Sequence, residues 1–153
     1  ERFFVAGLLH DIGILVMYSQ LDGHVADMRA ELDGGEHTLH AAELERFEFS
    51  HACVGAEVLA QWGLPASLLS GVRFHHVPAG AQTANHEAAL ISLADRLSNQ
   101  SSDHSLHPAI EPEQGEHGDA LRILGVDSAT FNATAIVERS QTAFSQAMRN
   151  LMP

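Results

Sequence analysis

The sequence predicts an all-α domain, a multi-helix bundle without a substantial sheet. Apolar residues recur every three or four positions along most of the chain, which is the spacing of one helix face. Glycine and proline stand between these periodic segments, where helices end and begin. No stretch alternates convincingly between apolar and polar residues, as a half-buried strand does. A chain of 153 residues, 45% of them hydrophobic, can bury one core, and we predict a single domain over residues 1–153.

Four helices are predicted in the first part of the chain, over residues 3–18, 21–33, 38–48 and 51–62. The first is apolar on most sides and is therefore expected to be central. The second is more polar, is expected to be exposed, and ends at Gly34. The third is amphipathic and has apolar positions at Leu39, Leu44 and Phe47. The fourth follows Ser50, a good N-cap, and ends before Gly63. Its apolar stripe consists of Val54, Val58, Leu59 and Trp62.

Four further helices are predicted over residues 65–76, 86–98, 119–124 and about 128–150. Pro65 suits a first helical turn. The helix over 86–98 is expected to bury Ala89, Leu90, Leu93, Ala94 and Leu97. Residues 99–118 are rich in Ser, His, Pro, Glu and Gly, which favours a mobile loop. Gly125 separates the last two helices.

The charge balance excludes several classes of partner. The chain carries 20 acidic side chains against 8 basic ones, all of them arginine, for a formal net charge of −12. Such a surface repels phosphate backbones and anionic membranes, so we expect neither nucleic-acid nor membrane binding. We expect no spanning helix, because no apolar run approaches roughly 20 residues, and we see no signal peptide. The single cysteine, Cys53, cannot form an internal disulfide, which fits a reducing, cytoplasmic setting.

Histidines and aspartates on apolar helices are the candidate metal ligands. Burying such a group alone costs several kcal/mol, so it must be paired, hydrogen-bonded or bound to metal. Imidazole nitrogens and carboxylate oxygens from different helices can converge on one divalent ion. The candidates are His10, Asp11, His51, His75, His76 and Asp95.

Each candidate also has an interpretation without a metal. His51 follows an N-cap and could lie on the surface of a first turn, and His75 and His76 could be favoured by the dipole at a helix C-terminus. Asp95 could be a solvated carboxylate, and Cys53 is interpreted as a small buried hydrophobe. The other histidines are assigned to solvent: His24, His37, His40, His86, His104, His107 and His117.

Five motifs carry a family resemblance: LLHDIG at residues 8–13, SHACVGAEVL at 50–59, WGLP at 62–65, FHH at 74–76 and LADRL at 93–97. The first resembles the signature of the HD superfamily of helical, metal-dependent phosphohydrolases. The series as a whole resembles the HDOD branch, whose domains are HD-related regulatory modules of bacterial signalling proteins. This resemblance implies an HD-like core over residues 1–98, followed by the loop at 99–118 and C-terminal helices over 119–151.

The resemblance also implies roles for the candidate residues. His10, Asp11 and Asp95 match ligands of one metal. His51 and one of His75 and His76 match ligands of a second metal or contacts to a substrate phosphate, so His51 and His75 are also the catalytic candidates. The metal would be Fe, Mn, Zn or Mg. The remaining ligand of the family lies on a helix upstream of the His-Asp doublet, and we expect the chain to be the C-terminal half to two-thirds of the domain.

Two departures from the related HD-GYP enzymes, which hydrolyse cyclic di-GMP, bear on function. The Gly-Tyr-Pro motif is missing after His76, and Ile14 stands where those enzymes have lysine. A phosphate site would have to rely on metal, histidine, helix N-termini, Arg73 or Arg96. We therefore predict a regulatory module that does not catalyse a reaction and that acts on a protein partner or an attached signalling domain. A second copy of the chain, in a homo-oligomer, is a further candidate partner.

The alternative is a metal-dependent phosphohydrolase, either a phosphomonoesterase or a cyclic-nucleotide phosphodiesterase. A stress-linked metal-sensing domain is a third class. In the regulatory interpretation His10, Asp11 and Asp95 form a hydrogen-bonded core network or a vestigial metal site.

Overall fold

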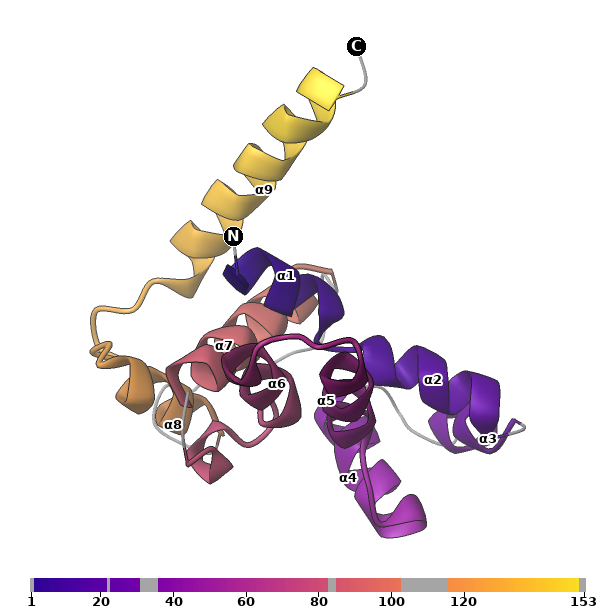
Figure 1. Cartoon of the computed structure of the whole chain (residues 1–153). Coiled ribbons are helices and arrows are strands. Elements are labelled where there is room, and N and C mark those ends of the chain that lie inside the picture. The colour runs from indigo at the N-terminus through magenta and orange to yellow at the C-terminus, as the bar shows by residue number, and fades with distance from the viewer. Residues whose placement is uncertain (1, 22, 31–35, 83–84, 103–115, 152–153) are drawn as a thin grey trace.

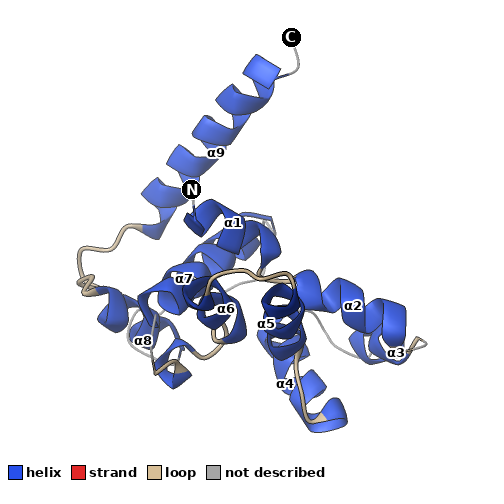
Figure 2. Ribbon diagram, in the orientation of Figure 1, coloured by secondary structure: helices blue, strands red, loops and turns tan. Residues whose placement is uncertain are grey.

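Helices supply all the regular secondary structure in the part of the chain that the structure, a computed structural model, describes (Figures 1 and 2). That part comprises residues 2–21, 23–30, 36–82, 85–102 and 116–151. The prediction of an all-α fold is confirmed. The elements are α1 (Arg2–Leu9), α2 (Ile12–Gln20), α3 (His24–Ala30), α4 (Glu36–Phe47), α5 (His51–Gln61), α6 (Ala66–Arg73), the 3₁₀ turn η1 (Pro78–Gly80), α7 (Asn85–Ser102), α8 (Glu116–Leu124) and α9 (Ala133–Leu151).

The helix predicted over residues 3–18 is in fact two helices. The chain turns at His10 and Asp11, so that α1 packs on α6 and α7 while α2 packs on α5. The contact between α2 and α5 is close: a Cβ at Gly13 would lie 2.0 Å from the carbonyl oxygen of His51 and 2.7 Å from the amide nitrogen of Gly55. The predicted single helix is wrong because one straight helix cannot make both sets of contacts.

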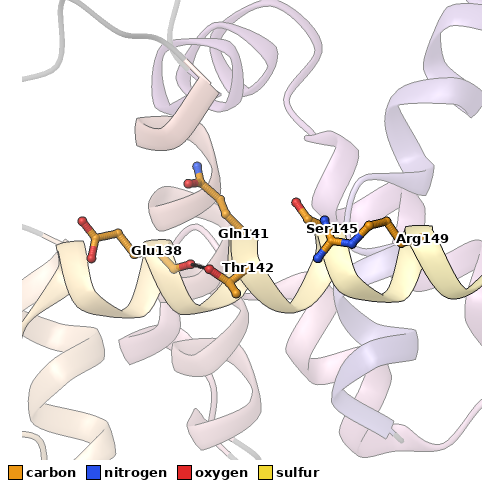
Figure 3. Close-up of a pocket in the computed structure, with 5 residues that line it drawn as sticks. All are labelled: Glu138, Gln141, Thr142, Ser145 and Arg149. Carbon is orange, nitrogen blue, oxygen red and sulfur yellow. Dashed lines mark hydrogen bonds between the residues drawn. The ribbon is translucent and has the colours of Figure 1, made fainter.

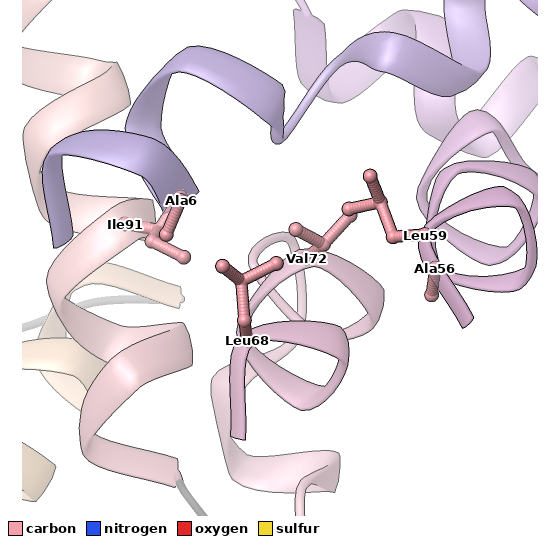
Figure 4. Close-up of a cluster of buried hydrophobic side chains, with 6 residues drawn as sticks. All are labelled: Ala6, Ala56, Leu59, Leu68, Val72 and Ile91. Atoms are coloured by element: carbon pink, nitrogen blue, oxygen red, sulfur yellow. The ribbon is translucent and has the colours of Figure 1, made fainter. Parts of the chain in front are cut away.

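The first apolar cluster joins α1, α5, α6 and α7. Figure 4 shows its side chains pointing toward one another from these four helices. Its buried members are Ala6, Ala56, Leu59, Leu68, Val72 and Ile91. This cluster fixes α5 and α6 against α7. Helix α5 begins with His51, α6 ends just before His75 and His76, and α7 carries Asp95.

The second cluster joins α2, α3 and α4, through Met17, Val25, Met28 and Leu39. Two expectations fail here. The segment 21–33 is not simply exposed, because Val25 and Met28 of α3 are buried. Leu44 of α4 is exposed instead of facing the core. Residues 31–35, including the predicted end of this helix at Gly34, lie outside the described residues.

Other boundaries and orientations also differ from the predictions. Trp62 and Ala94 are exposed. The helix after Pro65 ends at Arg73, before the His-His pair. Gly63 and Gly125 have positive φ angles, as expected for residues that follow helix ends.

Helices extend from both sides into the predicted loop over residues 99–118. Helix α7 continues to Ser102 and α8 begins at Glu116, while residues 103–115 lie outside the described part. The last helix, α9, begins at Ala133 and not near residue 128, because residues 128–130 form a turn.

Helix α9 extends away from the rest of the molecule (Figure 1). Only its first turns take part in the third apolar cluster, where Ala133 and Val137 pack beside Leu93, Leu97 and Leu121. A hollow on α9 is lined by one helix alone (Figure 3) and contains none of the predicted site residues. A ligand there would be contacted from one side only, so we assign it no site.

The stretch Arg2–Gln20 is long and apolar enough to cross a membrane, with a mean hydropathy of 1.4. The expectation that no such run exists is therefore wrong on length and composition. The finding is weak support for a membrane segment, because a core helix or a signal sequence meets the same criterion. In this structure the stretch is divided between α1 and α2 by the turn that carries His10 and Asp11.

Candidate metal centre

The structure brings all six predicted candidate residues together. His10 and Asp11 occupy the turn between α1 and α2, and His51 is the first residue of α5. His75 and His76 follow the end of α6, and Asp95 lies in the middle of α7. On a continuous helix, His10 and Asp11 would point about 100° apart. The turn removes that conflict and lets both side chains face the same centre.

Asp11 lies between the histidines and contacts them with both carboxylate oxygens. Its Oδ1 is 3.4 Å from Nε2 of His51 and 3.7 Å from Nε2 of His75. Its Oδ2 is 3.2 Å from Nε2 of His10. The same His10 nitrogen lies 3.3 Å from Oδ1 of Asp95. This single carboxylate therefore links two groups of donors.

Two sets of three residues have donor atoms within 4.8 Å of one another. One set is His51, His75 and His76, and the other is His10, Asp11 and His75. Within the first set, the Nε2 atoms of His51 and His76 are 2.9 Å apart. Donors this close can share one ion, since first-row metals bind imidazole nitrogen at about 2.0–2.1 Å. The cluster can therefore hold a metal.

Hydrogen bonds on the outer side of the rings direct the Nε2 atoms inward. Nδ1 of His10 donates to the carbonyl oxygen of Gly7 at 2.7 Å, and Nδ1 of His75 donates to that of Val72 at 2.6 Å. Nδ1 of His51 donates to Glu43. Nε2 of His75 is buried and has no hydrogen-bond partner among the described residues. A buried nitrogen without a partner costs free energy, and a metal ion would satisfy it.

Two of the histidines are held in the charged form. Burial disfavours the charge on His10, but hydrogen bonds to Asp11 and Asp95 outweigh burial and raise its pKa to about 10. Burial likewise opposes the charge on His51, and hydrogen bonds to Asp11 and Glu43 raise its pKa to about 9.

The other two histidines are held neutral. Burial lowers the pKa of His75 to about 4, and the charges of His10 and His51 add to that effect. Burial also lowers the pKa of His76. Although burial disfavours the Asp11 carboxylate, hydrogen bonds from His10 and His51 hold its pKa well below the usual range.

Two residues beside the centre were missed by the sequence interpretation. Glu43 of α4 is fully buried and contacts His51. His40, one turn earlier, is half-buried, and its ring centroid lies 4.4 Å from that of His76, so its assignment to solvent is wrong. The signal available was spacing: His40, Glu43 and Phe47 recur at helical intervals beside the buried Leu39. Of the other histidines assigned to solvent, His24 and His86 are exposed. Nothing is described for the side chains of His37, His104, His107 and His117.

The fold and the cluster together define an HD-related helical domain, in which a His-Asp doublet meets further histidines and a later aspartate. Comparison with known families gives the specific assignment. The sequence matches the HDOD domain over residues 1–78, just over half of the chain, and the chain belongs to that family. The match includes every candidate except Asp95, which the structure places against His10.

An uncharacterized protein of Treponema pallidum (strain Nichols) is 29% identical to this chain over 76 residues. The aligned region covers 48% of this chain and 14% of that protein, so this chain spans a small part of a much longer relative. No solved structure matches the chain significantly.

Proposed function

We propose that the chain is a regulatory module of a cytoplasmic signalling protein, which acts through contact with a protein partner or an attached domain and does not catalyse a reaction. The observation that supports this most directly is the burial of the three-histidine set. His51 and His75 are each 1% exposed and His76 is 7% exposed. A phosphorylated substrate must reach the metal to be hydrolysed, and these donors offer little surface to it.

The surroundings of the cluster support the same proposal. Ile14 packs against the second apolar cluster, in the position where HD-GYP enzymes have a lysine. The formal net charge of −12 also opposes the approach of a polyanion. Both features reduce the affinity for a phosphate-rich substrate without affecting the binding of a cation.

The proposed module holds a divalent metal as a structural or sensing element. His51, His75 and His76 would bind one ion, and His10, Asp11 and Asp95 offer donors for another. A donor set rich in imidazole favours Fe or Zn over Mn and Mg, which prefer oxygen ligands. A bound ion would cross-link the α1–α2 turn, α5 and the segment after α6. It would also stabilise the fold, by an amount that rises with the logarithm of its affinity.

Two measurements on the purified chain test the proposal. Metal analysis after expression with added Fe²⁺, Mn²⁺ or Zn²⁺ is expected to show bound metal that is strongly reduced in His75→Gln, since His75 belongs to both sets of donors. The loaded protein is expected not to hydrolyse p-nitrophenyl phosphate or bis(p-nitrophenyl) phosphate. Turnover that requires metal and disappears in Asp11→Asn would overturn the regulatory proposal.

The second candidate function is a metal-dependent phosphohydrolase, and one observation favours it. The two oxygens of Asp11 face different histidines, an arrangement that suits a carboxylate bridging two metals. Bound metals would supply an activated water and neutralise phosphoryl oxygens. The turnover assay above decides between the two functions, since it has opposite expected outcomes.

A further inference from the structure

Glu43 is a charged residue in the interior of the molecule. It lies on α4, its exposed fraction is 0%, and its carboxylate is directed at the start of α5. One oxygen, Oε2, accepts two hydrogen bonds from the same residue: the backbone N–H of His51 donates at 2.9 Å and the ring Nδ1–H of His51 donates at 2.6 Å. Glu43 thus contacts both the backbone and the ring of one candidate ligand.

The backbone contact takes the place of a local helix cap. Ser50 occupies the N-cap position of α5 with an extended backbone, but its side chain makes no capping hydrogen bond. The first N–H groups of a helix have no partner within the helix, and a carboxylate near them is favourable. Glu43 satisfies the N–H of His51 from a different helix and thereby couples α4 to the first turn of α5.

The ring contact fixes which nitrogen of His51 faces the centre. A carboxylate accepts hydrogen bonds, so Nδ1 of His51 carries the proton and points outward. Nε2 then points inward, 2.9 Å from Nε2 of His76 and 3.4 Å from Oδ1 of Asp11. His10 and His75 are oriented in the same way by backbone carbonyls, whereas His51 depends on a side chain that can be changed by mutation.

We propose that Glu43 is a positioning residue for the metal centre, which orients His51 and increases its basicity as a ligand. This inference rests on the proposed metal binding. Carboxylate partners of metal-bound histidines act in this way and set the ring orientation. The other oxygen, Oε1, is buried without a hydrogen-bond partner among the described residues. An apolar residue would avoid that unpaired oxygen but could not hold the ring.

The test compares Glu43→Leu and Glu43→Gln with the unchanged chain. We expect Glu43→Leu to weaken Zn²⁺ binding about 10- to 100-fold, the usual effect of removing such a partner. Glu43→Gln is expected to restore most of the affinity, because its amide oxygen can accept both hydrogen bonds. Glu57→Gln, on the exposed side of α5, is the matched control and is expected to bind Zn²⁺ normally. Affinity is measured by competition with a chromophoric chelator.

Proton NMR of the metal-free chain supplies a readout that a purely structural role would not change. The hydrogen-bonded Nδ1–H of His51 is expected as a downfield resonance protected from exchange, retained in Glu43→Gln and lost in Glu43→Leu. Unchanged Zn²⁺ affinity in a folded Glu43→Leu, or a retained resonance, would overturn the inference. If the unchanged chain binds no metal, the metal part of the proposed function fails, and the resonance still shows whether Glu43 orients His51.

Discussion

The inner and outer halves of the cluster differ in burial and in charge. The inner half consists of His51, His75 and His76, which are at most 7% exposed. The outer half consists of His10, Asp11 and Asp95, whose side chains are 12–29% exposed. Both halves consist of residue types that bind metals, but they differ in which side chains are charged.

The outer half pairs its charged groups with one another, whereas the inner half contains two neutral histidines. A charged His10 is bonded to Asp11 and Asp95, so this group is stable without an ion. In the inner half, burial keeps His75 and His76 neutral, and Nε2 of His75 has no hydrogen-bond partner among the described residues. We infer that the inner half has the greater need for a metal and binds it first. Four predictions test this difference, from the largest expected effect to the smallest.

Gly13→Ala is expected to disrupt both halves. The new Cβ would lie 2.0 Å from the backbone of His51, and no side-chain rotation relieves a clash with backbone. Moving α2 away from α5 would separate Asp11 from His51. We expect a loss of unfolding free energy of about 3 kcal/mol or more, measured by urea denaturation of the metal-free chain.

Gly7→Ala is the control for this prediction. A Cβ at Gly7 meets nothing within 4 Å, and alanine raises helix propensity by about 1 kcal/mol. This variant is expected to be as stable as the unchanged chain or slightly more stable. Equal stability of Gly13→Ala and Gly7→Ala would mean that the close contact between α2 and α5 does not exist in solution.

His75→Gln is expected to lower the affinity for the first equivalent of Zn²⁺ more than Asp95→Asn does. Structural sites with four ligands bind Zn²⁺ with a free energy of about 10–16 kcal/mol. The loss of one ligand therefore costs roughly 3 kcal/mol, which lowers the affinity about 100-fold. Asp95 belongs to the outer half, and its loss is expected to weaken this first ion by no more than about tenfold. Titration calorimetry with Zn²⁺ measures both.

The exposed His86 supplies the control, and His86→Gln is expected to bind like the unchanged chain. A larger loss of affinity in Asp95→Asn than in His75→Gln would reverse the proposed order of the two halves.

Metal affinity is expected to rise with pH between 6.5 and 8.5. A metal must displace the protons that His10 and His51 carry below their pKa values of about 10 and 9. Each displaced proton changes the affinity by about tenfold per pH unit. The inner half contains only one of these charged histidines. The affinity for the first ion is therefore expected to change with pH as it does when one proton is displaced. Zn²⁺ competition assays at three pH values give this slope.

The stability of the metal-free chain is expected to fall both as pH rises above 6.5 and as pH drops below 6.5. The pKa values of His10 and His51 are raised above 6.5, so their stabilisation is complete below pH 6.5 and is lost as pH rises through 9 to 10. The pKa of His75 is lowered to about 4, so its contribution is complete above pH 6.5 and is lost as pH falls toward 4. Urea midpoints should be highest near pH 6.5 and should fall steadily from there to pH 9, and midpoints that rise between pH 6.5 and 9 would contradict these signs.

The helical pattern and the HDOD motifs were readable from the sequence, since both depend on local spacing. The positions of His10, Asp11, His51 and the His-His pair follow from those motifs. Glu43 was not found in advance, because a glutamate among apolar residues ordinarily marks an exposed helix face. Its burial depends on a partner, His51, that lies eight residues later and belongs to another helix.

The sequence by itself determined the all-α class, the family and the identity of the candidate ligands, because periodicity and short motifs are properties of neighbouring residues. The tertiary structure decided the break between α1 and α2, which turns Asp11 toward two groups of histidines. It also decided the burial of Glu43 and the division of the cluster into a buried inner half with two neutral histidines and a more exposed, ion-paired outer half. These features arise from contacts between helices distant in sequence, and the burial they create sets which groups carry charge.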